Sequence, residues 1–173
     1  MASDFTIIQP VRQRFGDGPP TQFEVYFEND APFVGRAKDF PFSCPNVDLK
    51  AMGLLQFESL GVTAGGITNY GNARNILQIN GNDVPGGITP GPAIEDLSEK
   101  YPLIPIWKSH SLIVPQYVLR EENVLHIEAV KMAIAIEETY DTFIIDNIVV
   151  FFKTNVQGHG KGGEVVSTGK LKS

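Results

Sequence analysis

Residues 122–129, ENVLHIEA, decide how the fold is interpreted, because their side chains alternate in polarity. Leu125, Ile127 and Ala129 fall on one face of an extended chain, and His126 and Glu128 fall on the other. This period of two predicts a β-strand with one buried face. Along such a strand His126 and Glu128 would lie about 7 Å apart. We interpret His126 as a polar residue on a half-exposed strand face; a catalytic base oriented by Glu128 is the alternative.

Short runs rich in Ile, Val, Phe and Leu lie on both sides of this strand, separated by Pro and Gly. They predict further strands at residues 5–10, 22–28, 53–62, 75–81, 110–115 and 142–154. The residues NGND at 80–83 tolerate positive φ and predict a chain reversal after Ile79. Helix signals are confined to one or two short turns, at 92–101 and 115–123. The pattern indicates an all-β fold, an antiparallel jelly-roll β-sandwich with extended termini.

We divide the chain into three parts. Residues 1–35 form an N-terminal arm with the first strands, residues 36–154 form the core of the sandwich, and residues 155–173 form a tail rich in Gly and Lys. The tail carries too few apolar residues to build a core of its own. A long, proline-rich connection spans residues 84–105. Long loops on a rigid sandwich are common places for binding sites.

Composition and charge narrow the classes of function. The 173 residues carry a formal charge of −6, which argues against nucleic acid as a partner, because such binding depends on basic patches. No apolar run is long enough to span a bilayer, so we expect no membrane insertion. Residues 1–20 do not have the pattern of a signal peptide. We therefore expect synthesis in the cytoplasm, with release in a particle such as a virion as an alternative.

Residues that could do chemistry are few and scattered. Cys44 is the single cysteine, which excludes an intrachain disulfide, and we expect it to be buried. With only three histidines beside it, no zinc ligand set with short spacings is present. No nucleophile, phosphate-binding or metalloprotease motif occurs. We therefore expect no catalytic residues, no enzyme activity and no cofactor.

Acidic residues near the last predicted strand allow one metal alternative. Glu138, Asp141 and Asp146 offer hard oxygen ligands for calcium, but their spacing lacks the dense pattern of a calcium loop. Asp146 and Asn147 interrupt an otherwise apolar run. We expect them to be structural, with hydrogen bonds donated by the backbone amides of a neighbouring turn.

Three segments in order carry a resemblance: NILQINGNDVPGG (75–87), IWKSHSLIVPQYVLREENVLHIEA (106–129) and YDTFIIDNIVVFFK (140–153). Together they resemble the galactose-binding-domain-like jelly rolls found in carbohydrate-binding modules and in the sugar-binding domains of glycosidases. The resemblance covers about residues 54–153. It implies a β-sandwich that binds a glycan or another surface ligand through loops at one end. The family has no fixed ligand motif, and our candidate ligand-binding residues are Trp107, Tyr101, Tyr70, Asn69 and Asn72. For Trp107, packing against the sandwich is an equal alternative.

Two functions follow from these observations. The first is a non-catalytic, lectin-like module that recognises carbohydrate. The second is a structural or assembly protein, such as a virion, tail or surface-layer component, which associates with itself through its terminal arms.

Overall fold

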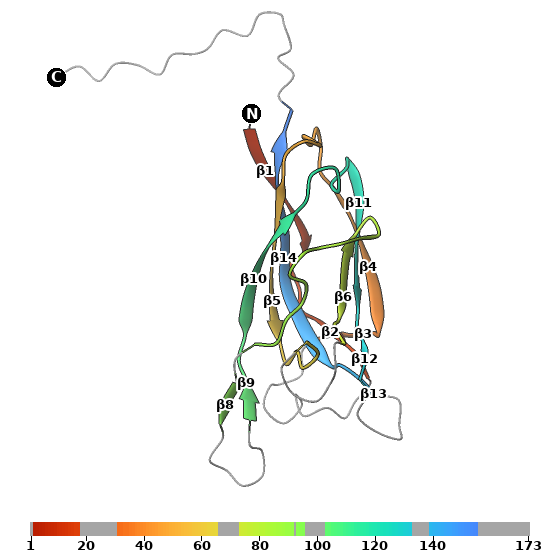
Figure 1. Ribbon diagram of the computed structural model, residues 1–173, viewed down its shortest axis with the longest axis vertical. Helices are drawn as coiled ribbons and strands as arrows, with labels where there is room; N and C mark the ends of the chain where they lie inside the picture. Colours follow the sequence, from red (N-terminus) through yellow and green to blue (C-terminus); the bar gives the residue numbers. More distant parts are fainter. Residues whose placement is uncertain are drawn as a thin grey trace, which may run out of the picture.

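The computed structural model describes residues 2–17, 31–65, 73–91, 93–95, 103–132 and 139–155. The described chain is all-β, and its two main sheets lie against each other as a sandwich (Figure 1). The larger sheet contains β1 (Ala2–Gln9), β2 (Gln13–Phe15), β3 (Phe33–Gly35), β5 (Gly53–Leu60), β10 (Lys108–Val114) and β14 (Phe143–Thr154). The smaller sheet contains β4 (Ala37–Ser43), β6 (Ile76–Ile79), β7 (Asn82–Asp83) and β11 (Glu122–Glu128).

The six-stranded sheet is built around β14, its longest strand. The order across it is β10-β5-β14-β2-β3, and β1 pairs with β14 beside β2. These pairs are antiparallel except for β2 with β3, which is parallel. Because β1 pairs with β14 from Ala2 to Gln9, the N-terminal residues belong to the sheet. Asn147 has a φ of 52° at a bulge in β14, and this bulge shifts the register with β5.

The smaller sheet has the order β4-β11-β6-β7. The predicted reversal after Ile79 is confirmed: Asn80 and Gly81 have φ values of 53° and 76°, and they connect β6 to the antiparallel β7. Both values are typical of the tight hairpin turns that favour Asn-Gly. The described residues also form two short antiparallel strand pairs, β8 (Ala93–Glu95) with β9 (Leu103–Pro105) and β12 (Lys131–Met132) with β13 (Thr139–Tyr140).

The core lies between the two main sheets and takes side chains from both. Leu55 from β5 and Val150 from β14 are fully buried in one cluster with Ile79 from β6 and Leu125 from β11. Alternate residues of β4, β5, β6 and β11 enter this cluster, as the period of two predicts. Cys44 is buried in it as expected, and burial raises the pKa of its thiol to about 12, helped by the nearby Asp4 and Glu122.

The predicted strands at 5–10, 53–62, 75–81, 110–115, 122–129 and 142–154 correspond to β1, β5, β6, β10, β11 and β14. The predicted strand at 22–28 lies outside the described residues. The helical turn predicted for residues 92–101 is wrong where it can be compared, because Ala93–Glu95 pairs with Leu103–Pro105 as a strand. Residues 115–118 form a single hydrogen-bonded turn with Tyr117 at positive φ, rather than a helix. In the described part of the chain no helix has the length and apolar character of a membrane span.

Candidate functional site

His126 lies on the outer face of β11, as the alternation predicts. Its Nδ1 donates a hydrogen bond to Asp39 Oδ1 (2.7 Å) on the neighbouring β4, and its Nε2 donates to Glu128 Oε2 (3.3 Å). The hydrogen bond to Asp39 raises the pKa of His126, against a smaller lowering by partial burial, and the bond to Glu128 raises it further. Both ring nitrogens thus face carboxylates on a solvent-facing sheet, an arrangement that favours the protonated imidazole. A protonated imidazole has no free nitrogen with which to accept a proton from a substrate.

His110 lies inside the sandwich, although it comes from a strand with serines on both sides of it. Its ring stacks on Phe57 with centroids 4.4 Å apart, and its Nε2 shares a hydrogen bond with Ser59 Oγ (2.8 Å). Burial lowers its pKa to about 4, and the charge of Lys108 lowers it in the same direction. A Ser–His contact can activate a nucleophile, but Ser59 is only 1% exposed and a substrate cannot reach it in this conformation. The pair instead satisfies two polar groups within the core.

Asp141 holds three segments together. Its carboxylate accepts hydrogen bonds from the backbone amides of Thr63 and Ala64 and from Asn75 Nδ2 (2.6 Å). Asn75 Oδ1 in turn accepts a bond from the backbone amide of Val130. Both residues are nearly inaccessible, so this network fixes the loop after β5 to the starts of β6 and β14.

The alternative calcium site would use the carboxylates of Asp141, Asp146 and Glu138 as ligands. Asp146 accepts bonds from Arg12 Nε (3.0 Å) and from the backbone amide of Asn147 (2.9 Å), so its donors are not the neighbouring turn that we expected. The carboxylates of Asp141 and Asp146 thus each have their own set of donors, and Glu138 lies outside the described residues. Within the described ranges, no cluster of three His, Cys, Asp or Glu side chains is arranged to hold a metal ion.

Trp107 is the one candidate ligand-binding residue that the structure describes. Its half-buried side chain packs on Ala31, Leu60 and Ile144, and the guanidinium of Arg12 lies 5.2 Å from the centre of its ring. These contacts fit the packing alternative, because a neighbouring cation already covers the ring. Tyr101, Tyr70, Asn69 and Asn72 lie outside the described residues.

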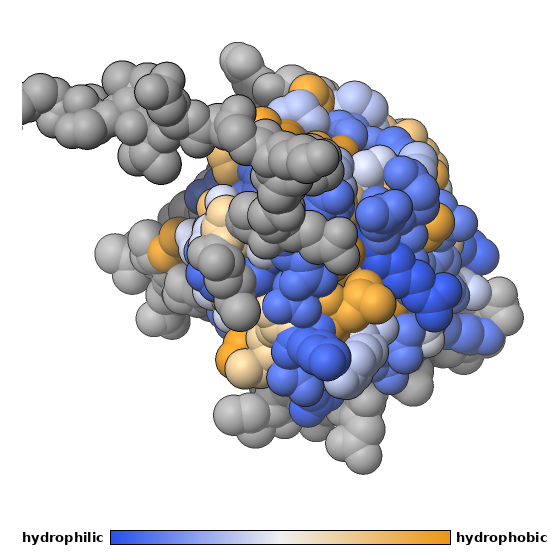
Figure 2. All heavy atoms as spheres, turned by 90° about the horizontal axis from the view of Figure 1, so that it is seen from above, coloured by the Kyte–Doolittle hydropathy of each residue, from blue (hydrophilic) through white to orange (hydrophobic). Residues whose placement is uncertain are grey.

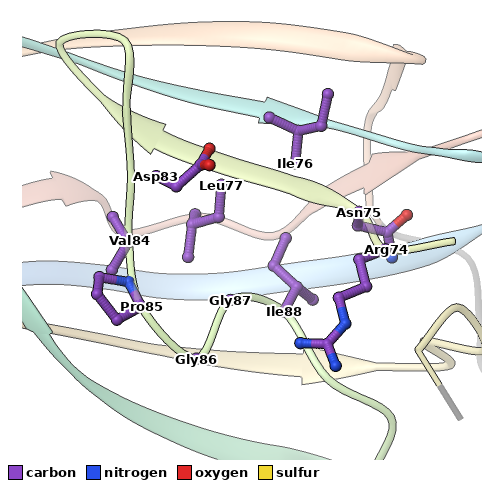
Figure 3. A pocket seen from close by; sticks show the side chains of 10 residues that line it. All are labelled: Arg74, Asn75, Ile76, Leu77, Asp83, Val84, Pro85, Gly86, Gly87 and Ile88. Carbon is purple, nitrogen blue, oxygen red and sulfur yellow. The ribbon is translucent and has the colours of Figure 1, made fainter. Parts of the chain in front are cut away.

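A pocket of about 360 Å³ opens at the edge of the smaller sheet, beside β6 and β7. We call it the edge pocket. It is lined by residues 74–77, which lead into and begin β6, and by residues 83–88, which follow the hairpin turn. Figure 3 shows Asp83 and Arg74 toward opposite ends of this lining in the view chosen, with Leu77 and Ile88 between them.

The local sequence explains the shape of the edge pocket. After β7 the chain turns back, and the Val84 amide donates a hydrogen bond to the Leu77 carbonyl (3.0 Å). The residues VPGG (84–87) then make a tight turn, in which Gly86 and Gly87 have φ values of 93° and 57°. A Cβ at Gly86 would lie 2.9 Å from Leu112 Cδ2, so the loop approaches β10 as closely as a glycine permits. Leu77, Val84 and Ile88 are buried members of the core and form an apolar floor.

The polar groups of the edge pocket differ in how far they are already committed. The side-chain amide of Asn75 already donates to Asp141 and accepts from the Val130 amide, so we assign it a structural role in the wall of the pocket. Asp83 Oδ1 accepts a bond from Gln78 Nε2 (2.8 Å), and its second oxygen has no partner among the described residues. Arg74 is exposed, and its guanidinium makes no hydrogen bond or ion pair with any described residue. A cation and a carboxylate oxygen are therefore open to a ligand.

Sequence reasoning did not single out Arg74 or Asp83. The signal available was positional: Asp83 ends the NGND turn, and the edge pocket stands at the beginning of the long connection at 84–105 that we associated with binding. The predicted Asn69, Tyr70 and Asn72 precede Arg74 in the sequence by two to five positions. Comparisons with known proteins add no assignment: no family model, curated protein or solved structure matches this chain.

Proposed function

We propose that this protein is a non-catalytic binding module that recognises a saccharide at the edge pocket. The observation that carries the proposal is an apolar floor of Leu77, Val84 and Ile88 with the uncommitted groups of Arg74 and Asp83 beside it. A pyranose ring has the matching chemistry, since its C–H face is apolar and its hydroxyls both donate and accept hydrogen bonds.

The size and charge of the edge pocket limit the range of ligands that it could bind. A volume of about 360 Å³ is at the small end of the range for ligand pockets, and it suits one sugar unit at a time. Arg74 donates to hydroxyl or carbonyl oxygens, while Asp83 accepts from hydroxyls. Asn69, Tyr70 and Asn72 come just before Arg74 in the sequence, and an aromatic ring and amides are groups of the kind that sugar sites use.

The test is a glycan array, with and without calcium, followed by calorimetry on the sugars that bind. Arg74→Ala and Asp83→Ala should each weaken binding about 10-fold or more, because a hydrogen bond to a charged group contributes about 1.5–3 kcal/mol. Arg120→Ala removes another exposed arginine far from the pocket in sequence and should leave the affinity unchanged. An array without any bound sugar, or equal affinity in all three variants, would contradict the proposal.

An assembly role is the second candidate function. It is supported by a different surface, the outer face of the six-stranded sheet, which exposes several large apolar side chains.

A further inference from the structure

Two rows of uncharged side chains, most of them apolar, cross the outer face of the six-stranded sheet. In the first row, Phe5, Phe151, Leu54 and Ile113 are cross-strand neighbours on β1, β14, β5 and β10. The Phe5 and Phe151 ring centroids are 6.0 Å apart. The second row, one pleat further along, contains Ile7, Val149, Gln56 and Ser111. We call these eight residues the outer apolar face.

Exposure is what makes the outer apolar face unusual. Phe5, Ile7 and Ile113 are 56%, 55% and 56% exposed, and Phe151 is 39% exposed. A contiguous apolar surface of this kind on a soluble domain marks an interaction site more often than a solvated surface. Apolar groups also show at the end of the sandwich where β1 begins, as small orange groups among blue ones (Figure 2).

The smaller sheet provides the internal comparison. Its outer face carries Asp39, His126 and Glu128, which bond to one another, and Asp83 lies further across. This is the ordinary pattern for a strand face in water. The outer apolar face has no charged residue in either row, although the chain as a whole has a charge of −6.

Charge and area identify the kind of partner. The two rows themselves offer no charge to pair with a basic or acidic partner, whereas two copies of an acidic chain can lay these rows together with no like charges within them. The exposed parts of Phe5, Ile7, Ile113 and Phe151 total roughly 400 Å² per copy, taking about 200 Å² for each side chain. Two copies would therefore bury roughly 800 Å² of these four side chains alone, and a stable interface buries about 1,200–2,000 Å² in all, so the neighbouring residues of the face must supply the remaining area.

We propose that the outer apolar face binds a second copy of this chain, sheet against sheet, in a two-fold dimer. The two-fold axis that lays each row against its own counterpart runs parallel to the strands. It sets β1 of one copy opposite β10 of the other, so Phe5 faces Ile113 of the second copy. Phe151 and Leu54 meet in the same way nearer the axis.

Analytical ultracentrifugation of the full chain, up to about 500 µM, tests the proposal. The native chain should form dimers. Phe5→Glu and Ile113→Lys should each weaken the dimer at least 10-fold, because each places an unpaired charge against an apolar group. An equimolar mixture of the two variants should associate again, since each new glutamate then faces a new lysine while the second contact stays native. Val124→Glu changes a residue 40% exposed on the outer face of the smaller sheet and should have no effect.

Thermal melting of each variant checks that the fold is retained, and all three substituted positions are exposed at the surface. A native chain that stays monomeric at the highest concentration overturns the proposal. So does a dimer that is insensitive to both charged variants, or a mixture that fails to associate. A monomeric chain whose saccharide binding is lost in Ile113→Lys would instead assign this face to the glycan and would also refute the dimer.

Discussion

Removal of the Asp141 carboxylate should be among the most destabilising single changes in this protein. Asp141 is 2% exposed, and three donors point at it: the amides of Thr63 and Ala64 and the side chain of Asn75. In Asp141→Ala all three donors stay buried and lose their acceptor. Each unsatisfied buried donor costs about 1–3 kcal/mol, so we expect a loss of at least about 3 kcal/mol in the free energy of unfolding.

Asp141→Asn separates the loss of one acceptor oxygen from the loss of the whole carboxylate. The amide keeps one oxygen for Ala64 and Asn75 but turns an N–H₂ group toward the Thr63 amide, so its cost should fall between zero and that of the alanine variant. Urea unfolding followed by circular dichroism measures both. Asp39→Ala removes a carboxylate that is 67% exposed and should cost no more than about 1 kcal/mol. An Asp141→Ala cost below about 1 kcal/mol, or one equal to that of Asp39→Ala, would refute the network as described.

Two further predictions concern His110 and a glycine. The pKa of His110 is lowered from 6.5 to about 4 in the folded state. The contribution of the neutral ring to stability is therefore fully present above pH 6.5. Up to about 3 kcal/mol of the free energy of unfolding is lost as the pH falls toward 4. His110→Gln should flatten this part of a stability profile measured by urea unfolding from pH 4 to 7; an unchanged slope would show that other groups cause it. Gly16 has a φ of 106°, and a Cβ there would lie 2.3 Å from the Asp141 carbonyl oxygen, whereas a Cβ at Gly81 meets nothing within 4 Å. Thermal melts should therefore show a larger loss for Gly16→Ala than for Gly81→Ala, and the reverse order would contradict this geometry.

The strands that sequence predicted correctly are those in which local alternation and burial agree. Residues 122–129 and 53–62 are examples, because each places one apolar face on the core. The strand β4 was missed because Pro41 interrupts it. Proline is tolerated there because β4 is the edge of its sheet and one side needs no ladder hydrogen bonds.

The site residues were harder to predict because their partners are distant in sequence. Asp141 and Asn75 are 66 positions apart, and the sequence around either residue does not predict their contact. The edge pocket depends on how closely residues 84–88 return over the end of the core, which is a property of packing. His110 did carry a signal, since it alternates with Leu112 and Val114, but its partner Ser59 comes from another strand. Ile113 is exposed for the same reason: the alternation of β10 that buries His110 turns Ile113 outward.

A dimer formed through the outer apolar face would carry two edge pockets. The edge pocket opens beside β6 and β7, and the outer apolar face lies on the opposite sheet, so a dimer formed through that face leaves both pockets free. Two pockets on one rigid particle bind a multivalent surface far more tightly than a single sugar, by about 10²–10⁴-fold. We therefore expect native protein to remain on a dense glycan surface much longer than Ile113→Lys, while both have the same affinity for the free sugar in calorimetry. Equal retention on the surface would show that the dimer, if it forms, does not present its pockets together.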